Sequence, residues 1–371
     1  MMSNIIINAI NSNSAGGLSV VSNFLEQLSL DLNHNDKYTL IVTDRRLYER
    51  FSSEKLKLLV LPKFLVFPFF NIFTYLILFW FIAKIYKSEK LLNFGDLIPF
   101  VSCRIYYYFD WAFSLYDDTS IWSRMSIKQK LPRKVKSYLI RKMINRCHIV
   151  ICQTDAIKKR LENIVDVEKV FIVPNSVRKN FIRDDEKYQF PCSLEDKEVF
   201  LYLTRYYPHK NIEVLLELAI KAKNDDKNWI FILTIDETQG KEVAIFQENI
   251  VNLGLADYFV LVGSVAYDDV YKLYNASHHV ILPSLIESFS SMHIEAMIAG
   301  KTIFSSDRDF ARTVCGDTAY YFDPLDAENI YQIVNAGIIK STSSPVLCKK
   351  RTFVGLSSWE DSYDRIKKII S

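Results

Sequence analysis

Short apolar segments with strand periodicity alternate with helical segments along nearly the whole chain, and this alternation restricts the fold more than any other feature. Chains that alternate strand and helix in this way form parallel sheets covered by crossover helices. In the first half, strands are predicted at Asn4–Ile10, Tyr38–Val42, Leu58–Leu61, Ile105–Tyr108, Ile149–Cys152 and Lys169–Val173. In the second half, they are predicted at Val199–Leu203, Trp229–Thr234, Tyr258–Val262, His279–Leu282, Thr302–Ser305 and Ala319–Phe322.

The chain has 371 residues, which is enough for two hydrophobic cores. Between Arg178 and Glu198 the sequence becomes polar and charged and contains Pro191, as expected of a linker. We therefore predict an α/β protein with a first domain at residues 1–180 and a second at 195–356. The tail at residues 357–370, SSWEDSYDRIKKII, has helical periodicity.

Two glutamates, Glu287 and Glu295, lie eight residues apart where a strand at about His279–Ser284 gives way to a helix. Such a junction directs backbone N–H groups beyond the strand end, where they can bind an anion or a sugar hydroxyl. Helix capping does not explain Glu295, because a capping box needs Ser or Thr three residues earlier and Met292 is there. The pair is a candidate ligand site, although two glutamates are also common on a solvated surface.

A second candidate site follows the strand in KEVFLYLTR, residues 197–205. We expect this strand to end on Arg205, and a helix to begin at Lys210 after a loop that contains Pro208. The planar guanidinium and the lysine cation can then bind one diphosphate together. The alternative is that both are solvated cations beside a loop.

Several segments, taken in order, resemble the family 4 retaining nucleotide-sugar glycosyltransferases. They are IIINAINSNSAGGLSVVSNFLEQL, QTDAIKKRL, IVPNSV, the Arg205 and Lys210 pair, LVGSVAYDDVYKLYNASHHVILPS, the two glutamates and FDPLDAENI. This resemblance covers nearly the whole chain. It implies the GT-B fold, with two Rossmann-like domains, an interdomain cleft and a C-terminal helix that crosses back to the first domain. NFGDLIPF and the following YYYFDWAFSLYDDTSIWSRM are most similar to enzymes that build O-antigen or capsular polysaccharide repeat units.

The resemblance also implies roles for residues of the second domain. It assigns Glu287 to hydroxyls of the donor sugar, Glu295 to the ribose, and backbone amides around Ser290, Ser291 and Met292 to the sugar and phosphate. Family members normally have a glycine where this chain has Ser290. The implied partners are a nucleotide-sugar donor and an undecaprenyl-type lipid-linked saccharide, which the first domain receives.

The first domain has a glycine pair before a helix expected to begin near Leu18. Glycines there let the backbone approach a phosphate or an acceptor, so Gly17 is a candidate on the donor side and Gly16 on the acceptor side. The dinucleotide fingerprint G-x-G-x-x-G is absent from the sequence, so a dehydrogenase is not expected.

The segment after the strand Ile105–Tyr108 supplies two more candidates. Family members often have a histidine or similar polar group near this point, whereas this chain has Phe109 and Asp110. Asp110 could accept a proton from the acceptor hydroxyl, or it could only cap the loop before Trp111. Trp111 itself is a candidate on the acceptor side.

The segment Phe64–Ala83 contains no charged residue over a length that could cross a membrane. A span would place strands of one sheet on opposite sides of the membrane. The interpretations left open are a helix that lies in the membrane interface, a helix buried in the protein core and, as the least favoured of the three, a true span.

The stretch from Thr119 to Thr154 contains no acidic residue but many basic ones, a pattern that favours an anionic membrane surface. A solvated helix face is the alternative, and no nucleic-acid-binding module accompanies the stretch, so no nucleic acid partner is predicted. The basic residues are Arg124, Lys128, Lys130, Arg133, Lys134, Lys136, Arg141, Lys142 and Arg146.

These features together predict a retaining glycosyltransferase that moves a sugar from a nucleotide-sugar to a lipid-linked glycan. Arg205 and Lys210 supply the positive charge, so no metal ion or other cofactor is expected. The expected location is cytoplasmic, since the six cysteines form no C-x-x-C pair and no secretory signal is visible. The apolar segment and the basic stretch predict that the protein is peripheral on the inner face of the cytoplasmic membrane. The alternatives are a GT-B nucleotide-sugar epimerase or phosphorylase, and a non-catalytic nucleotide-sugar-binding partner in polysaccharide assembly.

Overall fold

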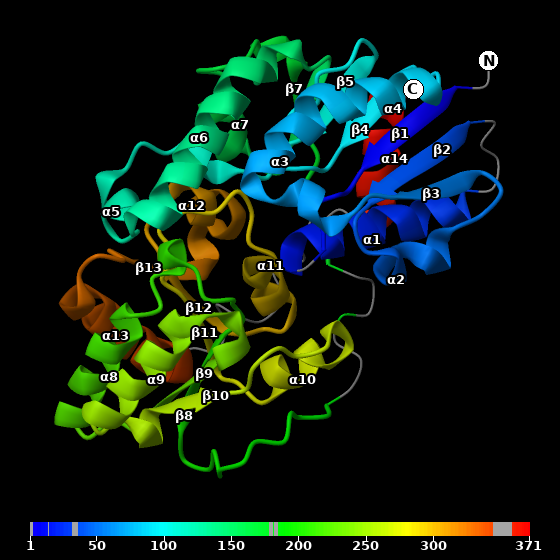
Figure 1. Cartoon of the computed structure of the whole chain (residues 1–371). Helices are drawn as coiled ribbons and strands as arrows, with labels where there is room; N and C mark the ends of the chain where they lie inside the picture. Colours follow the sequence, from blue (N-terminus) through cyan, green and yellow to red (C-terminus); the bar gives the residue numbers. More distant parts are fainter. Residues whose placement is uncertain (1–2, 14, 32–35, 178–180, 182–184, 344–357) are drawn as a thin grey trace. The chain divides into compact units, whose positions relative to one another are not determined.

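The computed structural model describes residues 3–13, 15–31, 36–177, 181, 185–343 and 358–371 (Figure 1). Its contacts divide the chain into two compact units. The first unit consists of residues 1–117, 126–176 and 357–371, and the second consists of residues 118–125 and 177–356.

The first unit is built on a parallel sheet with the strand order β3-β2-β1-β4-β5-β6-β7. Its strands are β1 (Asn4–Asn8), β2 (Lys37–Val42), β3 (Leu56–Val60), β4 (Lys90–Asn93), β5 (Arg104–Tyr108), β6 (Ile149–Cys152) and β7 (Val170–Ile172). The order reverses between β1 and β4, which is where open α/β sheets place their binding crevice.

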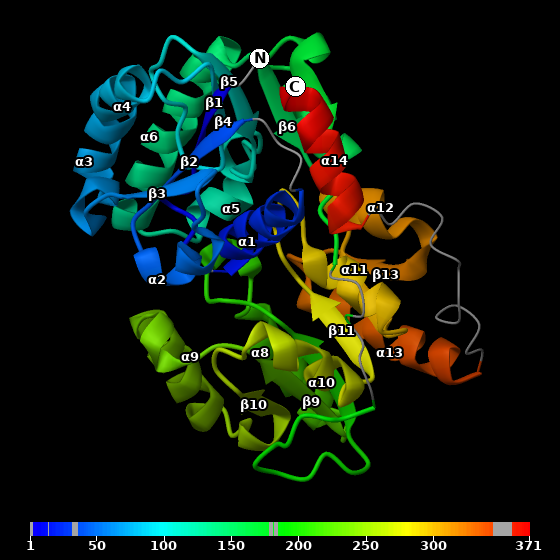
Figure 2. The ribbon, with the colours of Figure 1, turned by 90° about the vertical axis from the view of Figure 1, so that its right-hand side faces the viewer.

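Helices cover both faces of this first sheet. They are α1 (Ala15–Leu30), α2 (Arg45–Tyr48), α3 (Pro68–Phe73), α4 (Phe79–Ile85), α6 (Ile127–Met143), α7 (Asp155–Leu161) and α14 (Trp359–Ile370). Right-handed crossovers that run in opposite directions along a sheet lie on opposite faces. Accordingly, α3, α4 and α6 lie on one face and α1 and α14 on the other (Figure 2).

The C-terminal helix α14 packs on the first unit, as the fold prediction states. Ser358 and Asp361 form a capping box that starts the helix. Ile366 and Ile370 enter the core beside β1 and β2, and the Tyr363 hydroxyl donates to Asp31 at 3.0 Å. The last segment of the chain is therefore part of the first hydrophobic core.

The second unit is built on a parallel sheet with the strand order β10-β9-β8-β11-β12-β13. Its strands are β8 (Glu198–Tyr202), β9 (Trp229–Leu233), β10 (Phe259–Leu261), β11 (His279–Leu282), β12 (Thr302–Ser306) and β13 (Ala319–Phe322). Its helices are α8 (Val214–Asn224), α9 (Lys241–Asn252), α10 (Val270–Asn275), α11 (Ser291–Ile298), α12 (Asp309–Cys315) and α13 (Ala327–Ser343). The short helix α5 (Thr119–Ser123) also belongs to this unit, and Asp118 before it pairs with Arg308 at 3.2 Å.

The prediction of two Rossmann-like α/β units is confirmed, and all twelve predicted strands are present with shifts of at most two residues at their ends. Strand β4 was not predicted. Its sequence KLLN places only two apolar residues between Lys90 and Asn93, so it forms no apolar run that would predict a strand. The interdomain cleft stays a prediction, and much of the predicted linker Arg178–Glu198 lies outside the described residues or in irregular chain.

Three local predictions are wrong. Strand β8 ends at Tyr202, so Arg205 lies in the loop beyond it, and Lys210 ends a short 3₁₀ turn before α8 begins at Val214. Helix α1 begins at Ala15 rather than near Leu18, so the glycine pair lies in its first turn.

The predicted apolar helix Phe64–Ala83 is divided into four parts. A 3₁₀ turn at Lys63–Val66 is followed by α3, a π-helical turn at Thr74–Leu78 and α4. No helix among the described residues is both long and apolar enough to cross a membrane.

Candidate functional site

The strand order of the second sheet reverses between β8 and β11, and the predicted residues follow these two strands. Arg205 and Lys210 come after β8, and Glu287 comes after β11. Because both strands are parallel, their carboxyl ends lie at the same edge of the sheet, where α/β proteins bind ligands. The topology therefore places the two candidate sites of the second half at one switch point.

Lys210 and Glu287 contact each other directly. The Nζ atom of Lys210 lies 2.5 Å from Oε1 of Glu287, and the two side chains are only 18% and 11% exposed. Removing either partner of a pair this enclosed would leave the other charge without compensation, which lowers the free energy of unfolding. The sequence predicted both residues as site residues but not their contact.

The turn that carries Lys210 is fixed by Asn211. This residue adopts the left-handed conformation at φ 54° and is fully buried. Its amide donates to the backbone oxygens of Pro283 at 3.2 Å and Pro324 at 2.7 Å, which lie beyond β11 and β13. The Leu285 N–H also donates to the His209 oxygen at 2.8 Å. Asn211 thus aligns the Lys210 turn with the Glu287 loop, and no pattern in the sequence identified it.

The backbone on both sides of Arg205 is also fixed. The Thr204 N–H donates to Oγ1 of Thr234 at 2.8 Å, and the Tyr206 N–H donates to Oε1 of Gln239 at 3.0 Å. Within the part of the chain that the structure describes, no hydrogen bond or ion pair holds the Arg205 guanidinium itself. Arg205 is therefore a cation on a fixed loop whose donors remain available for a ligand.

Helix α11 begins at Ser291, directly after the Glu287 loop, with Ser290 as its N-cap residue. No side chain caps this end. Free N–H groups at a helix N-terminus favour an anion, so Ser291 and Met292 can serve as the predicted backbone donors. That role stays a prediction.

Glu295 lies inside α11 and is 5% exposed. Its Oε2 atom accepts a hydrogen bond from the Tyr274 hydroxyl at 2.9 Å. Burial raises the pKa of Glu295 to about 7, against the opposing effects of hydrogen bonds from Tyr274 and Ser291. The predicted contact of Glu295 with the ribose stays a prediction, and Tyr274 is a contact that the sequence did not indicate.

The raised pKa of Glu295 makes stability depend on pH. Between its ordinary value of 4.5 and about 7, the folded protein retains a proton that the unfolded chain loses, so stability falls as pH rises through this window. We expect the wild-type free energy of unfolding to fall between pH 5 and pH 8 by up to about 3 kcal/mol more than that of Glu295→Gln. Urea unfolding at the two pH values measures the difference.

The matched control for this pH test is Glu328→Gln, because Glu328 is an exposed glutamate of the same unit. Between pH 5 and pH 8, the free energy of unfolding of Glu328→Gln should fall as much as that of the wild type. If Glu295→Gln shows the same loss as the wild type, the assigned pKa of Glu295 is wrong.

The first unit brings Asp110 and Trp111 together with two residues that the sequence analysis did not assign to a site. Nζ of Lys136 lies 2.7 Å from Oδ1 of Asp96 and 3.3 Å from the centre of the Trp111 ring. Desolvation of the carboxyl raises the pKa of Asp110 to about 7 although the residue is exposed, while Lys136 opposes the shift and Asp96 adds to it. Trp111 is the N-cap residue of the next turn and makes no capping hydrogen bond through its side chain. Both roles considered for Asp110, as a proton acceptor and as a cap, stay predictions.

The reversal point of the first sheet, between β1 and β4, carries a polar network. Asn8 donates to Asn93 at 2.5 Å and to the Tyr75 hydroxyl at 3.2 Å, and that hydroxyl donates to Asn11 at 2.8 Å. Gly95 is required beside this network, because a Cβ atom there would lie 2.0 Å from the Tyr75 hydroxyl oxygen. Tyr75 comes from the π-helical turn, so the apolar segment reaches the predicted crevice through one side chain.

The glycine pair has open space around it. A Cβ atom on Gly16 would meet no atom within 4 Å, and one on Gly17 would make only ordinary contacts with Ser12. Packing does not require glycine at either position, so a ligand contact remains a reason for the pair. The donor role of Gly17 and the acceptor role of Gly16 stay predictions, and Ser14 lies outside the described residues.

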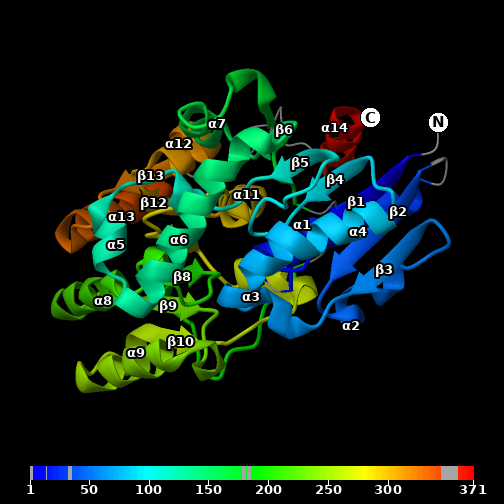
Figure 3. The same ribbon diagram turned by 45° about the horizontal axis from the view of Figure 1, so that its top comes forward.

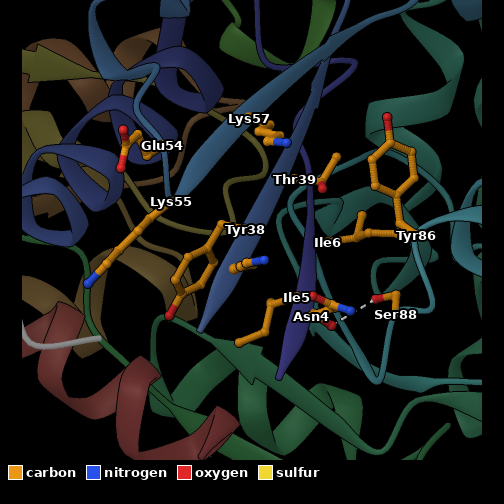
Figure 4. Close-up of a pocket in the computed structure, with 11 residues that line it drawn as sticks. Asn4, Ile5, Ile6, Tyr38, Thr39, Glu54, Lys55, Lys57, Tyr86 and Ser88 are labelled. Carbon is orange, nitrogen blue, oxygen red and sulfur yellow. Dashed lines mark hydrogen bonds between the residues drawn. The ribbon is translucent and has the colours of Figure 1, made fainter. Parts of the chain in front are cut away.

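A pocket of about 130 Å³ lies elsewhere in the first unit (Figure 4). Its lining includes Asn4, Lys37 and Lys55, which lie at or just before the amino ends of β1, β2 and β3. This is the edge of the sheet opposite to the one at which α/β folds bind ligands. The pocket is therefore not a candidate for the nucleotide-sugar site.

Comparison with known families finds a match within the second unit. Residues 184–343 match the model of the family "Glycosyl transferases group 1". Residues 184–343 are thus similar to the group 1 glycosyl transferases. This segment contains all the site residues predicted in the second half, and the match confirms the resemblance inferred from the sequence motifs.

Two curated relatives extend the likeness beyond this segment. A lipopolysaccharide 1,2-N-acetylglucosaminetransferase from Salmonella typhimurium is 24% identical over 59% of this chain and 61% of its own length. The gpi3 subunit of a phosphatidylinositol N-acetylglucosaminyltransferase from Schizosaccharomyces pombe is 23% identical over 46% of this chain and 37% of its own length. The chain thus spans less than two thirds of either relative.

Solved structures similar to this chain share its fold over both units. Sucrose-phosphate synthase from Thermosynechococcus elongatus has a TM-score of 0.74 at 13% identity, covering 99% of this chain and 98% of that one. HepE from Anabaena, solved with UDP and glucose, has a TM-score of 0.72 at 13% identity and covers 99% of both chains. A UDP-N-acetylglucosamine 2-epimerase has a TM-score of 0.59 at 13% identity, covering 100% of this chain and 96% of that one. The chain therefore has the GT-B fold over both units.

Proposed function

We propose that this chain is a family 4 glycosyltransferase that moves a sugar, with retention, from a nucleotide-sugar to a lipid-linked glycan. The observation that carries the proposal is the Lys210–Glu287 pair, which follows β8 and β11 at the same switch point as the Arg205 loop, within the segment similar to group 1 glycosyl transferases. The lipid-linked glycan would be an O-antigen or capsular repeat unit on an undecaprenyl-type carrier. The enzyme would act in the cytoplasm, at the inner face of the cytoplasmic membrane.

The chemistry follows from charge. As the bond from the anomeric carbon to the diphosphate oxygen breaks, the leaving diphosphate takes the electron pair and needs positive partners. Arg205 supplies unpaired guanidinium donors, and Lys210 supplies an enclosed cation. Glu287, held by Lys210, accepts hydrogen bonds from hydroxyls of the donor sugar.

The acceptor hydroxyl must lose a proton as its oxygen bonds to the anomeric carbon. Asp110 is the base in this proposal, since its pKa of about 7 lets the carboxylate take a proton near neutral pH. Trp111 and Gly16 would bind the acceptor.

The names of the relatives suggest which substrates to try first. Both curated relatives are N-acetylglucosaminyltransferases, and both names include a lipid-bearing acceptor. HepE was solved with UDP. Nucleotide-linked N-acetylglucosamine is therefore the first donor to test, and a lipid-linked saccharide the first acceptor.

The test is to screen nucleotide-sugars by thermal shift and then to measure transfer by mass spectrometry. We expect one nucleotide-sugar to raise the melting temperature, and the acceptor mass to increase by one sugar residue when both substrates are present. Because a UDP-N-acetylglucosamine 2-epimerase shares the fold, epimerisation of a nucleotide-sugar is the second candidate function. Conversion of the donor to its epimer without an acceptor would contradict the transferase proposal, as would binding without turnover.

We expect transfer to continue in the presence of EDTA, because Arg205 and Lys210 supply the charge that a metal ion would otherwise bring. The rate of donor consumption with and without chelator measures this. Complete loss of activity that magnesium or manganese restores would contradict the metal-independent mechanism.

A further inference from the structure

The apolar segment of the first unit is buried on one side only. Tyr75, Phe79 and Ile82 pack inward, with at most 5% of each side chain exposed. On the opposite side five large side chains are each between 42% and 60% exposed, and we call them the apolar row. The apolar row consists of Phe67, Phe70, Phe73, Ile77 and Phe81.

Helix α6 has an outward face of similar character. Ile127, Leu131, Val135 and Tyr138 recur at three- and four-residue spacing, and all four are exposed. Lys128, Lys134 and Lys142 are exposed on the same helix and lie between or beside these side chains along the sequence. This face combines apolar side chains with cations.

The apolar row and α6 belong to neighbouring parts of one surface. Both helical segments cover the same face of the first sheet (Figures 2 and 3). Phe100 connects the segment of the apolar row with the turn after α6, since its N–H donates to the Tyr75 oxygen at 2.8 Å and the guanidinium carbon of Arg146, in that turn, lies 3.8 Å from its ring centre. Phe100 is itself an exposed apolar side chain.

The two chain segments that form this surface carry charge of one sign, and Asp96 and Asp117, which pair with two of its cations, come from other segments. Neither the segment 62–87 nor the segment 119–154 contains an acidic residue. Exposed apolar side chains gathered in this way mark a docking surface. The core of a protein–protein interface is depleted of lysine, whereas a bilayer accepts apolar side chains beneath anionic headgroups that attract cations.

We infer that this surface docks the protein on an anionic phospholipid bilayer, with the apolar row inserted at the acyl boundary and the α6 lysines at the headgroups. The inference rests on the proposed function only in that a lipid-linked acceptor would be met there. It replaces the buried-core interpretation of Phe64–Ala83 with an interfacial one.

The structure also shows which basic residues of the stretch Arg124–Arg146 are exposed for contact with lipid headgroups. Lys136 is paired with Asp96, Arg141 with Asp117, and Arg133 is intermediate in exposure and donates to the Gln129 oxygen. Arg124 belongs to the second unit. The stretch Arg124–Arg146 is therefore not one uniform basic face, and the exposed lysines of α6 are the ones to test.

The test is flotation with vesicles of phosphatidylglycerol and phosphatidylcholine, compared with phosphatidylcholine alone. The triple variant Phe67→Ser, Phe73→Ser and Phe81→Ser should lower the partition coefficient by about tenfold or more, since each inserted ring contributes apolar burial. The variant Lys128→Gln, Lys134→Gln and Lys142→Gln should reduce only the preference for anionic vesicles. High salt should do the same.

The matched control removes three exposed apolar side chains of the second unit, in the variant Ile245→Ser, Val251→Ser and Ile339→Ser. It should float like the wild type. Thermal shift with the donor, measured without vesicles, should be the same for all of these proteins. A missing donor response with normal flotation would count against the proposed function alone.

Equal flotation of the wild type and the phenylalanine variant would overturn the inference. So would a wild-type dimer in sedimentation that the same variant dissociates, because the surface would then bind a second copy of the chain. Loss of flotation in the phenylalanine variant but not in the control supports it.

Discussion

Glu287→Gln should abolish nearly all sugar transfer while the protein remains folded. The substitution keeps the side-chain volume and an oxygen that can accept from Lys210, but it removes the charge placed to bind the sugar. Loss of one preorganised polar contact of this kind lowers kcat by roughly 10²–10³-fold. The measurement is the rate of transfer at saturating donor, together with the melting temperature.

Glu328→Gln is the matched control, because Glu328 also pairs with a lysine at 2.5 Å, but in an exposed pair with Lys221. The control should keep wild-type activity, since exposed ion pairs contribute little. Transfer by Glu287→Gln within a factor of two of the wild type would remove Glu287 from the site.

Arg205→Ala and Lys210→Ala should each slow transfer by roughly 10²–10³-fold, because each removes a cation that faces the leaving diphosphate. The structure predicts different effects on stability. Arg205 has no ion pair among the described residues, so its removal should leave the melting temperature unchanged. Removal of Lys210 leaves the enclosed Glu287 carboxylate unpaired, which should cost up to about 3 kcal/mol of unfolding free energy.

The double variant Lys210→Ala and Glu287→Gln should recover much of that stability without recovering activity, because no charge is then left unpaired. Lys221→Ala serves as the control for truncation of a paired lysine. A loss of stability in Arg205→Ala that matches its loss of activity would mark Arg205 as a structural residue instead.

The strands could be predicted because apolar runs bounded by polar turns are visible in a single sequence. Strand β4 could not, since its sequence KLLN holds only two apolar residues between Lys90 and Asn93 and so forms no apolar run. The π-helical turn at Thr74–Leu78 was also invisible, because the apolar sequence continues through it without a break. The π-helical turn is accompanied by tertiary contacts that a single sequence does not show, since Tyr75 reaches Asn8 and Asn11.

The residues of the candidate site were only partly predictable. Glu287 and Lys210 follow strands in a recognisable order, but their pairing requires the adjacency of β8 and β11. Asn211 fixes its turn by a left-handed backbone conformation and by hydrogen bonds to two carbonyl oxygens that are distant in sequence. The spacing of residues along the sequence does not indicate either feature. Lys136 appeared to belong to a basic face because Asp96, its partner, lies far away in sequence.

The most direct test of the account is the stabilisation of the protein by increasing concentrations of the nucleotide-sugar that the screen selects. Binding to the native state alone raises unfolding free energy in proportion to the logarithm of ligand concentration. We predict a rising melting temperature for the wild type and for Lys221→Ala, with a shift to at least tenfold higher ligand concentration in Arg205→Ala. The same titration curve for Arg205→Ala and the wild type would contradict a diphosphate site at the β8–β11 switch point.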